Sequence, residues 1–151
     1  MPEHNSIVST VIADVVDKYD ADLIDVRRDL HAHPELSWSE LRTADVAVNR
    51  VEQVGWQVTR FSRTGFSADL GTAGPLVALR ADMDALPVHD LTDDPWTSTV
   101  PGVAHACGHD VHTAALIGAA MALSEVHDRG HLRGRVRLLF QPAEELSLIH
   151  I

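Results

Sequence analysis

The spacing of the apolar residues changes along this chain, and this change constrains the fold more than any other feature. Four segments have the pattern of helices, namely residues 6–17, 20–32, 37–54 and 111–127. Four others alternate between apolar and polar residues or are apolar almost throughout, which predicts strands at 56–61, 66–71, 76–81 and 135–140. Helices that alternate with buried strands favour an α/β sandwich built on a mixed sheet.

Prolines, glycines and polar residues indicate where these elements end. Pro34 should end the helix over residues 20–32, because the residue before a proline avoids the helical region. Ser37 and Glu40 have the spacing of a capping box, with Ser37 as the N-cap of the next helix. Gly55 suits the position just after that helix.

Segment 76–81 is typical of a central strand, since it is apolar up to Arg80. Residues 82–104 contain three prolines and many polar groups, which predicts a long surface loop of functional importance.

The composition excludes several classes of protein. At 151 residues the chain fits one domain, and its net charge of −10 argues against a nucleic-acid partner. The longest apolar run, residues 114–123, is too short to cross a bilayer, so no membrane partner is expected. No signal peptide is apparent at the N-terminus, and one cysteine excludes an internal disulfide. These features predict a cytoplasmic protein.

The run from His105 to His112 contains three histidines, Asp110 and the single cysteine, Cys107. In an extended segment Cys107 and His109 would share a face, and thiolate and imidazole together suit zinc and similar divalent metals. A buried free cysteine beside surface histidines is the alternative. A Cys/His nucleophile pair is less favoured, because such partners usually come from distant parts of a chain. His105 and His112 are interpreted as supporting groups.

Glu144 and Glu145 follow Pro142 at the end of the last predicted strand. Adjacent side chains of an extended chain point opposite ways, so one carboxylate could bind a metal while its neighbour serves as a base, provided that the backbone turns after Pro142. Two solvated glutamates at a strand end are the alternative. In open α/β sheets sites gather at the carboxyl ends of strands, which favours a joint site with Cys107 and His109.

Two further segments carry polar groups next to predicted elements. Asp82 or Asp84, after the strand at 76–81, could orient a ligand histidine, or could form a structural pair with Arg80. His31 and His33 lie at a predicted helix end, where the helix dipole favours a cationic ring, and are interpreted as structural.

Four segments in this order resemble one family: Arg28–Ser37, Leu79–Pro87, His105–Asp110 and Phe140–Glu145. They are similar to the dimetal amidohydrolases of the aminoacylase/carboxypeptidase superfamily. The subgroup is that of hippurate hydrolase, the N-acyl-amino-acid amidohydrolases and the auxin-conjugate hydrolases. The resemblance implies a three-layer α/β sandwich with a mixed sheet, which is the zinc-peptidase-like catalytic domain.

The resemblance also implies the roles of individual residues. Cys107, His109 and Glu145 match metal ligands, Glu144 matches the general base, and Asp84 matches the acidic residue that steadies the site. The cofactors would be two divalent ions, zinc or manganese. The implied reaction is hydrolysis of the amide bond of N-acyl amino acids or related small amides.

The family continues beyond Glu145 with further ligands and a lid domain that commonly mediates homodimerisation. Residues 1–145 are therefore expected to be the N-terminal part of a truncated catalytic domain, with the lid absent. The strand at 135–140 would then lack its later neighbours in the sheet and lie at an exposed edge. Residues 146–151 are expected to be a non-native tail, because Leu-Ser-Leu-Ile-His-Ile matches a translated sequencing adapter. The alternative function is an inactive fragment that binds metal incompletely or not at all.

Overall fold

The computed structural model describes residues 2–61 and 63–147. Within them the helices are α1 (Pro2–Ala32), α2 (Leu41–Gln53), α3 (His109–Asp128) and the short α4 (Glu144–Ser147). The strands are β1 (Gln57–Arg60), β2 (Phe66–Leu70), β3 (Leu76–Asp82) and β4 (Arg135–Gln141). Every segment predicted as a helix or a strand forms that element. None of the described helices is both long enough and apolar enough to cross a membrane.

The four strands form one mixed sheet in the order β1-β2-β4-β3. β2 is antiparallel to both β1 and β4, whereas β3 and β4 are parallel. A parallel pair needs a long crossover, and here it consists of the loop after β3 followed by α3. The prediction of an α/β fold with a mixed sheet is confirmed.

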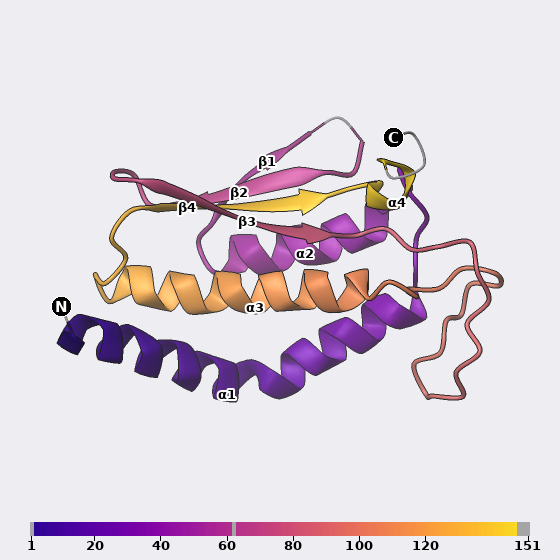
Figure 1. Ribbon diagram of the computed structural model, residues 1–151, viewed down its shortest axis with the longest axis horizontal. Helices are drawn as coiled ribbons and strands as arrows, with labels where there is room; N and C mark the ends of the chain where they lie inside the picture. The colour runs from indigo at the N-terminus through magenta and orange to yellow at the C-terminus, as the bar shows by residue number, and fades with distance from the viewer. Residues whose placement is uncertain (1, 62, 148–151) are drawn as a thin grey trace.

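In Figure 1, α1, α2 and α3 lie on one side of the sheet, with α3 between α1 and the strands, whereas α4 lies at the end of β4. The core fills the space between these layers. Phe66 on β2 pairs with Phe140 on β4, and their rings stack with centroids 4.4 Å apart. Leu30 of α1 and Ile117 of α3 are fully buried in the same cluster. Burial of these apolar side chains is the main force that holds the helices against the sheet.

Two expectations about the sheet were wrong for the described strands. β3 is an edge strand rather than a central one, and Val77 near its start is 58% exposed. β4 lies between β2 and β3 and is paired on both sides. An apolar run shows that a strand can be buried, but it does not show which strands will be its neighbours. Only the last residues of β3, Ala81 and Asp82, are buried.

The start of α2 also differs from the prediction. Ser37 does not cap this helix, because its hydroxyl donates to the carboxylate of Asp84. The carboxylate of Glu35 instead accepts the backbone N–H groups of Arg42 and Thr43, at 3.1 and 2.8 Å. These are first-turn donors that no carbonyl inside the helix can reach. A glutamate outside the helix therefore serves as its cap.

The long loop predicted over residues 82–104 is present, and it is anchored at several points. Two isolated bridges tie it down, Leu36 with Ala85 and Leu86 with Ala104. Farther along, the backbone N–H of Thr99 donates to the carbonyl of Ala32 at the end of α1. These bonds place the loop beside the carboxyl ends of β3 and β4.

Candidate metal centre

Three chain segments meet at the carboxyl end of the parallel pair β3 and β4. They are the residues after β3, the first turn of α3 and the short helix α4, which lie at the same end of the sheet in Figure 1. The sequence candidates Asp84, His109, Glu144 and Glu145 belong to these segments. Their meeting is a consequence of the parallel pairing, because parallel strands end at the same edge.

His109 is the first residue of α3, directly after Gly108, whose φ of +78° is readily adopted only by glycine. Its Nδ1 lies 2.8 Å from the backbone carbonyl oxygen of Asp84, so the N–H of that nitrogen donates to it. The side-chain hydrogen bond with Asp84 raises the pKa of His109 despite its burial. Nε2 is thereby directed toward the two glutamates, and in the neutral ring it can bind a metal.

Glu144 and Glu145 extend their carboxylates toward the same imidazole. Glu144 Oε2 and Glu145 Oε1 each lie 3.9 Å from His109 Nε2. The backbone turns after Pro142, and Glu144 and Glu145 form a helical turn rather than an extended segment, so both carboxylates approach the same imidazole. One ligand atom from each of the three residues lies within 4.8 Å of the others.

The donor chemistry of this group fits a divalent metal ion. Glu145 Oε1 is buried and has no hydrogen-bond partner among the described residues. A buried carboxylate oxygen without a partner is costly, and a bound cation would remove that cost. An imidazole nitrogen and carboxylate oxygens are ordinary ligands for zinc.

Asp84 lies behind this group and accepts hydrogen bonds from its backbone. Its two oxygens accept the N–H groups of Glu144 and Glu145, at 3.1 and 3.0 Å, and the Ser37 hydroxyl, at 2.6 Å. Burial alone would raise the pKa of Asp84, but hydrogen bonds from His109, Ser37 and the two amides outweigh it and lower this pKa to about 2. Asp84 therefore stays ionised and holds three candidate residues in place.

Cys107 lies next to the group of His109, Glu144 and Glu145 but is not part of it. Its side chain is exposed, and a hydrogen bond with Glu145 raises the pKa of the thiol to about 11. The extended segment expected over residues 107–109 is absent, because Gly108 turns the chain into α3. Cys107 thus approaches Glu145, while the His109 ring faces both glutamates.

A second group of possible ligands consists of Asp82, His109 and His112. The alternative of an ion pair between Arg80 and Asp82 is present, since Asp82 Oδ2 lies 3.1 Å from an Arg80 nitrogen. The same oxygen lies 3.6 Å from His112 Nδ1. His112 is 52% exposed on its side chain. An aspartate and a histidine with such partners form an ion-pair network without a metal, so the group with Glu144 and Glu145 is the stronger candidate.

The remaining histidines near the site are buried between α1 and α3. His31 Nδ1 lies 2.7 Å from Asp110 Oδ2, and Arg27 Nε lies 2.9 Å from the same oxygen. His105 is buried beside His31, and burial lowers the pKa of His105 to about 4. The structural interpretation of His31 agrees with these contacts. Asp110 joins this network and does not act as the N-cap of α3.

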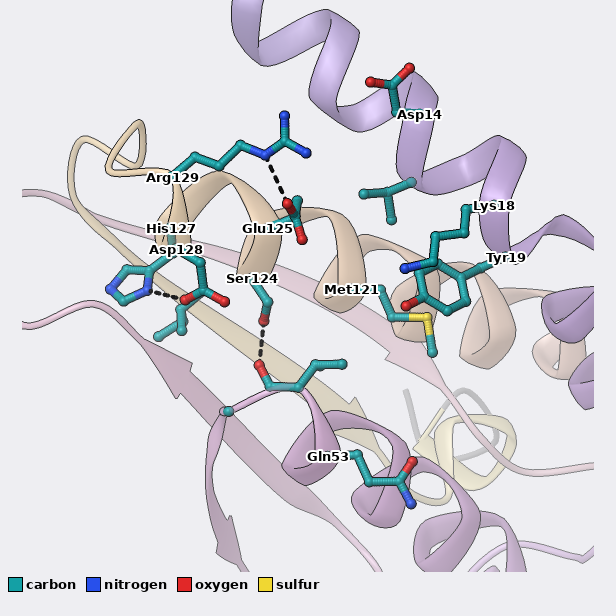
Figure 2. Close-up of a pocket in the computed structure, with 14 residues that line it drawn as sticks. Asp14, Lys18, Tyr19, Gln53, Met121, Ser124, Glu125, His127, Asp128 and Arg129 are labelled. Carbon is teal, nitrogen blue, oxygen red and sulfur yellow. Dashed lines mark hydrogen bonds and ion pairs between the residues drawn. The ribbon is translucent and has the colours of Figure 1, made fainter.

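A cavity of about 560 Å³ lies at the opposite end of α3, between α1, α2 and α3 (Figure 2). Four of the polar residues that line it are paired with one another, Arg129 with Glu125 at 2.7 Å and His127 with Asp128 at 3.4 Å. No group of three metal-ligating side chains is found there in the described part of the chain. This cavity does not compete with the site at the strand ends.

We expect Cys107→Ser to weaken the binding of Co²⁺ by about 100-fold, because even the loss of a residue that supports a ligand costs about 10–100-fold. Titration followed by optical absorbance measures both the affinity and the thiolate-to-cobalt charge-transfer band, which should disappear. His127→Gln, at the far end of α3, is the control for binding by surface histidines and should change neither quantity. An unchanged affinity and band in Cys107→Ser would exclude the thiol as a ligand.

Comparison with known proteins identifies the relatives of this chain. The sequence pattern of "Peptidase family M20/M25/M40" matches residues 78–148. An N-acetyl-L-cysteine deacetylase of Bacillus subtilis is 48% identical over 126 residues, covering 82% of this chain and 30% of the relative. An N-acyl-L-amino acid amidohydrolase of Geobacillus stearothermophilus is 45% identical over 135 residues, covering 87% of this chain and 36% of the relative.

The structure is similar to a solved structure from the same family. The YXEP protein of Bacillus subtilis, described as a dinuclear metal binding peptidase from the M20 family, superposes with a TM-score of 0.80 at 43% identity. That match covers 87% of this chain and 37% of the solved one. This chain spans about a third of the length of the curated relatives it matches. The resemblance carried by the four sequence segments is confirmed, and the chain belongs to peptidase family M20/M25/M40.

Proposed function

We propose that this chain is the N-terminal part of a metal-dependent amidohydrolase, with residues 1–145 contributing to its catalytic domain. The reaction is hydrolysis of the amide bond of N-acyl amino acids or related small amides. The observation that carries the proposal is the convergence of His109, Glu144 and Glu145 at the carboxyl ends of β3 and β4. The names of the relatives, a deacetylase of N-acetyl-L-cysteine and an N-acyl-L-amino acid amidohydrolase, support the substrate class.

Cys107, His109 and Glu145 are the residues of this chain that would hold divalent metal, two ions of zinc or manganese in the complete protein. When bound, such ions would polarise a carbonyl group and lower the pKa of water, so that a nucleophile is available at neutral pH. Further ligands would come from the rest of the protein, since the relatives are about three times as long.

Glu144 is the proposed general base. Its carboxylate takes a proton from the attacking water and passes it to the nitrogen of the leaving group. Two features suit Glu144 to this role. Its side chain is 16% exposed, so water can reach it, and its backbone N–H is held by Asp84. Asp84 acts through Glu144, Glu145 and His109 and does not need to touch the substrate.

An apolar pocket of about 520 Å³ adjoins the site. Leu36, Ala85, Leu86 and Pro87 line it together with Leu146 of the expected tail, and Ser37 and Glu145 lie on its wall. Pockets of this kind bind the apolar part of a ligand and leave the polar part to a few charged groups. The pocket supports a substrate whose acyl group or side chain is apolar, placed with its amide bond beside the glutamates.

Glu144→Gln tests the function in the complete protein. The amide cannot accept the proton, so we expect kcat for an N-acetyl amino acid to fall by about 10²–10⁴-fold. The bound metal, measured by atomic emission, should stay the same, because Glu144 is not one of the proposed ligands. Full activity in Glu144→Gln would refute its role as the base, and an enzyme unaffected by chelators would refute metal dependence.

The alternative is a fragment that binds metal incompletely and does not turn over substrate. The 151-residue chain itself distinguishes the two. Metal-dependent hydrolysis by the purified chain favours a functional site, whereas bound metal without hydrolysis favours the inactive fragment. A cytoplasmic location and a homodimer formed through a lid domain remain parts of the proposal for the complete protein.

A further inference from the structure

The turn before the two glutamates has an unusual backbone conformation. Ala143 has a φ of +53°, in the left-handed region that non-glycine residues rarely adopt, and it is buried. Such a conformation is unfavourable for a residue with a side chain and persists only where the surroundings enforce it. Ala143 directly precedes Glu144, so its conformation sets the direction in which α4 begins and both carboxylates point.

Glu40 is the group that holds this turn. Its side chain is fully buried, although it stands immediately before α2 and is 103 positions away from Ala143 in the sequence. One carboxylate oxygen, Oε1, accepts the backbone N–H of Ala143 at 2.7 Å. The other, Oε2, accepts the hydroxyl of Thr64 at 2.6 Å. Hydrogen bonds to a carboxylate are about twice as strong as those between neutral groups.

The loop between β1 and β2 closes on the same turn from another side. A Cβ atom at Gly65 would lie only 2.8 Å from Cδ of Pro142, so any larger residue there would push the proline away. Gly65 follows Thr64, the second partner of Glu40. The loop therefore contacts Pro142 directly and contacts Ala143 through Glu40.

Two buried carboxylates thus hold three successive backbone donors. Glu40 accepts the N–H of Ala143, while Asp84 accepts those of Glu144 and Glu145. We propose that Glu40 is a positioning residue of the metal centre, which keeps Ala143 left-handed so that both glutamates face His109. Glu40 does not touch the site itself. This inference rests on the proposed function in one respect only, namely that the species bound beside His109 is a divalent metal ion.

Glu40→Met tests the proposal, since methionine fills a similar volume but accepts no comparable hydrogen bond. We expect amide hydrogen exchange of residues 143–145 to become at least tenfold faster in the metal-free chain. The affinity for Co²⁺ should fall by about 10–100-fold, as for other groups that orient ligands. Glu40→Gln should retain both properties, because its carbonyl can accept from Ala143 while its amide donates to Thr64.

Ser124→Ala is the matched control. It removes a 2.6 Å hydrogen bond to the Val54 carbonyl oxygen at the other end of α3, so it lowers stability without touching the turn. Its exchange at residues 143–145 and its Co²⁺ affinity should match those of the unchanged chain. If Ser124→Ala and Glu40→Met alter these two quantities equally, Glu40 is merely structural and the proposal is overturned.

Two further outcomes keep this proposal separate from the proposed function. If the unchanged chain binds no Co²⁺, the metal centre fails, and hydrogen exchange of the metal-free chain still decides the role of Glu40. If Glu40→Met does not fold, Glu40→Asp serves instead, because it keeps the charge but shortens the side chain by one methylene group and so withdraws the oxygen from the N–H of Ala143. Normal exchange at residues 143–145 in Glu40→Asp would overturn the proposal, and accelerated exchange would support it.

Discussion

Asp84→Ala should lower the free energy of unfolding by about 3–5 kcal/mol and strongly weaken metal binding. The substitution leaves three donors without an acceptor, the N–H groups of Glu144 and Glu145 and the hydroxyl of Ser37. Each buried donor without a partner costs about 1–3 kcal/mol. The same loss frees both glutamates and His109, so the affinity for Co²⁺ should fall by about 100-fold. Urea unfolding and optical titration measure the two effects.

Asp84→Asn is the graded control, because it keeps the shape and one acceptor oxygen. We expect its stability and its Co²⁺ affinity to lie between those of Asp84→Ala and the unchanged chain. A loss of stability with unchanged Co²⁺ affinity in both variants would show that Asp84 supports the fold alone.

The contribution of Asp84 to stability should also depend on pH. Its pKa in the folded chain is about 2, against an ordinary value of 3.8. A lowered pKa means that the folded state favours the ionised group, so the stabilisation is complete above about pH 4. It disappears as the pH falls through 2. The difference in unfolding free energy between Asp84→Asn and the unchanged chain should therefore shrink over this range.

Phe140→Ala should have the largest effect on the fold. Phe140 is 1% exposed and stacks on Phe66 in the adjacent strand, in the centre of the sheet. Truncation of a buried phenylalanine to alanine costs about 3–5 kcal/mol, and the total stability of a domain is about 5–15 kcal/mol. We expect a large part of the chain to unfold at 37 °C, as measured by circular dichroism during thermal denaturation.

Phe140→Leu is the matched variant, since it keeps most of the apolar volume and should cost much less. The exposed Phe61→Ala controls for the loss of a phenylalanine as such and should change little, because Phe61 is 50% exposed. An equal loss of stability in Phe61→Ala and Phe140→Ala would contradict the assignment of the core.

The order of helices and strands could be predicted from the sequence because each depends on local spacing. The run from Leu76 to Ala81 predicted a strand, and it forms β3. Its place at the edge of the described sheet could not be predicted, since an apolar strand does not specify its neighbours. The helices predicted over residues 6–17 and 20–32 are one helix, because Lys18 and Tyr19 continue the helical conformation between them.

The candidate site was predicted in part. Residue types and positions near the ends of predicted strands indicate His109, Glu144 and Glu145. They leave Asp82 and Asp84 as alternatives, and the resemblance to the family selects Asp84. These four residues meet in the structure. The role of Glu40 was missed, because its spacing from Ser37 indicated a capping box. Its true partner is 103 positions away, and no local pattern indicates such a contact.

Spacing and residue chemistry are local properties, so the helical and extended segments and the side chains able to bind a metal follow from the amino-acid sequence. The directions in which those side chains point depend instead on tertiary packing. Gly108 and Ala143 turn the backbone at positive φ, and the buried carboxylates of Glu40 and Asp84 hold the second of these turns and the residues after it. Such contacts form only after distant segments have packed together, so the orientation of a metal-binding side chain depends on the packing of the core.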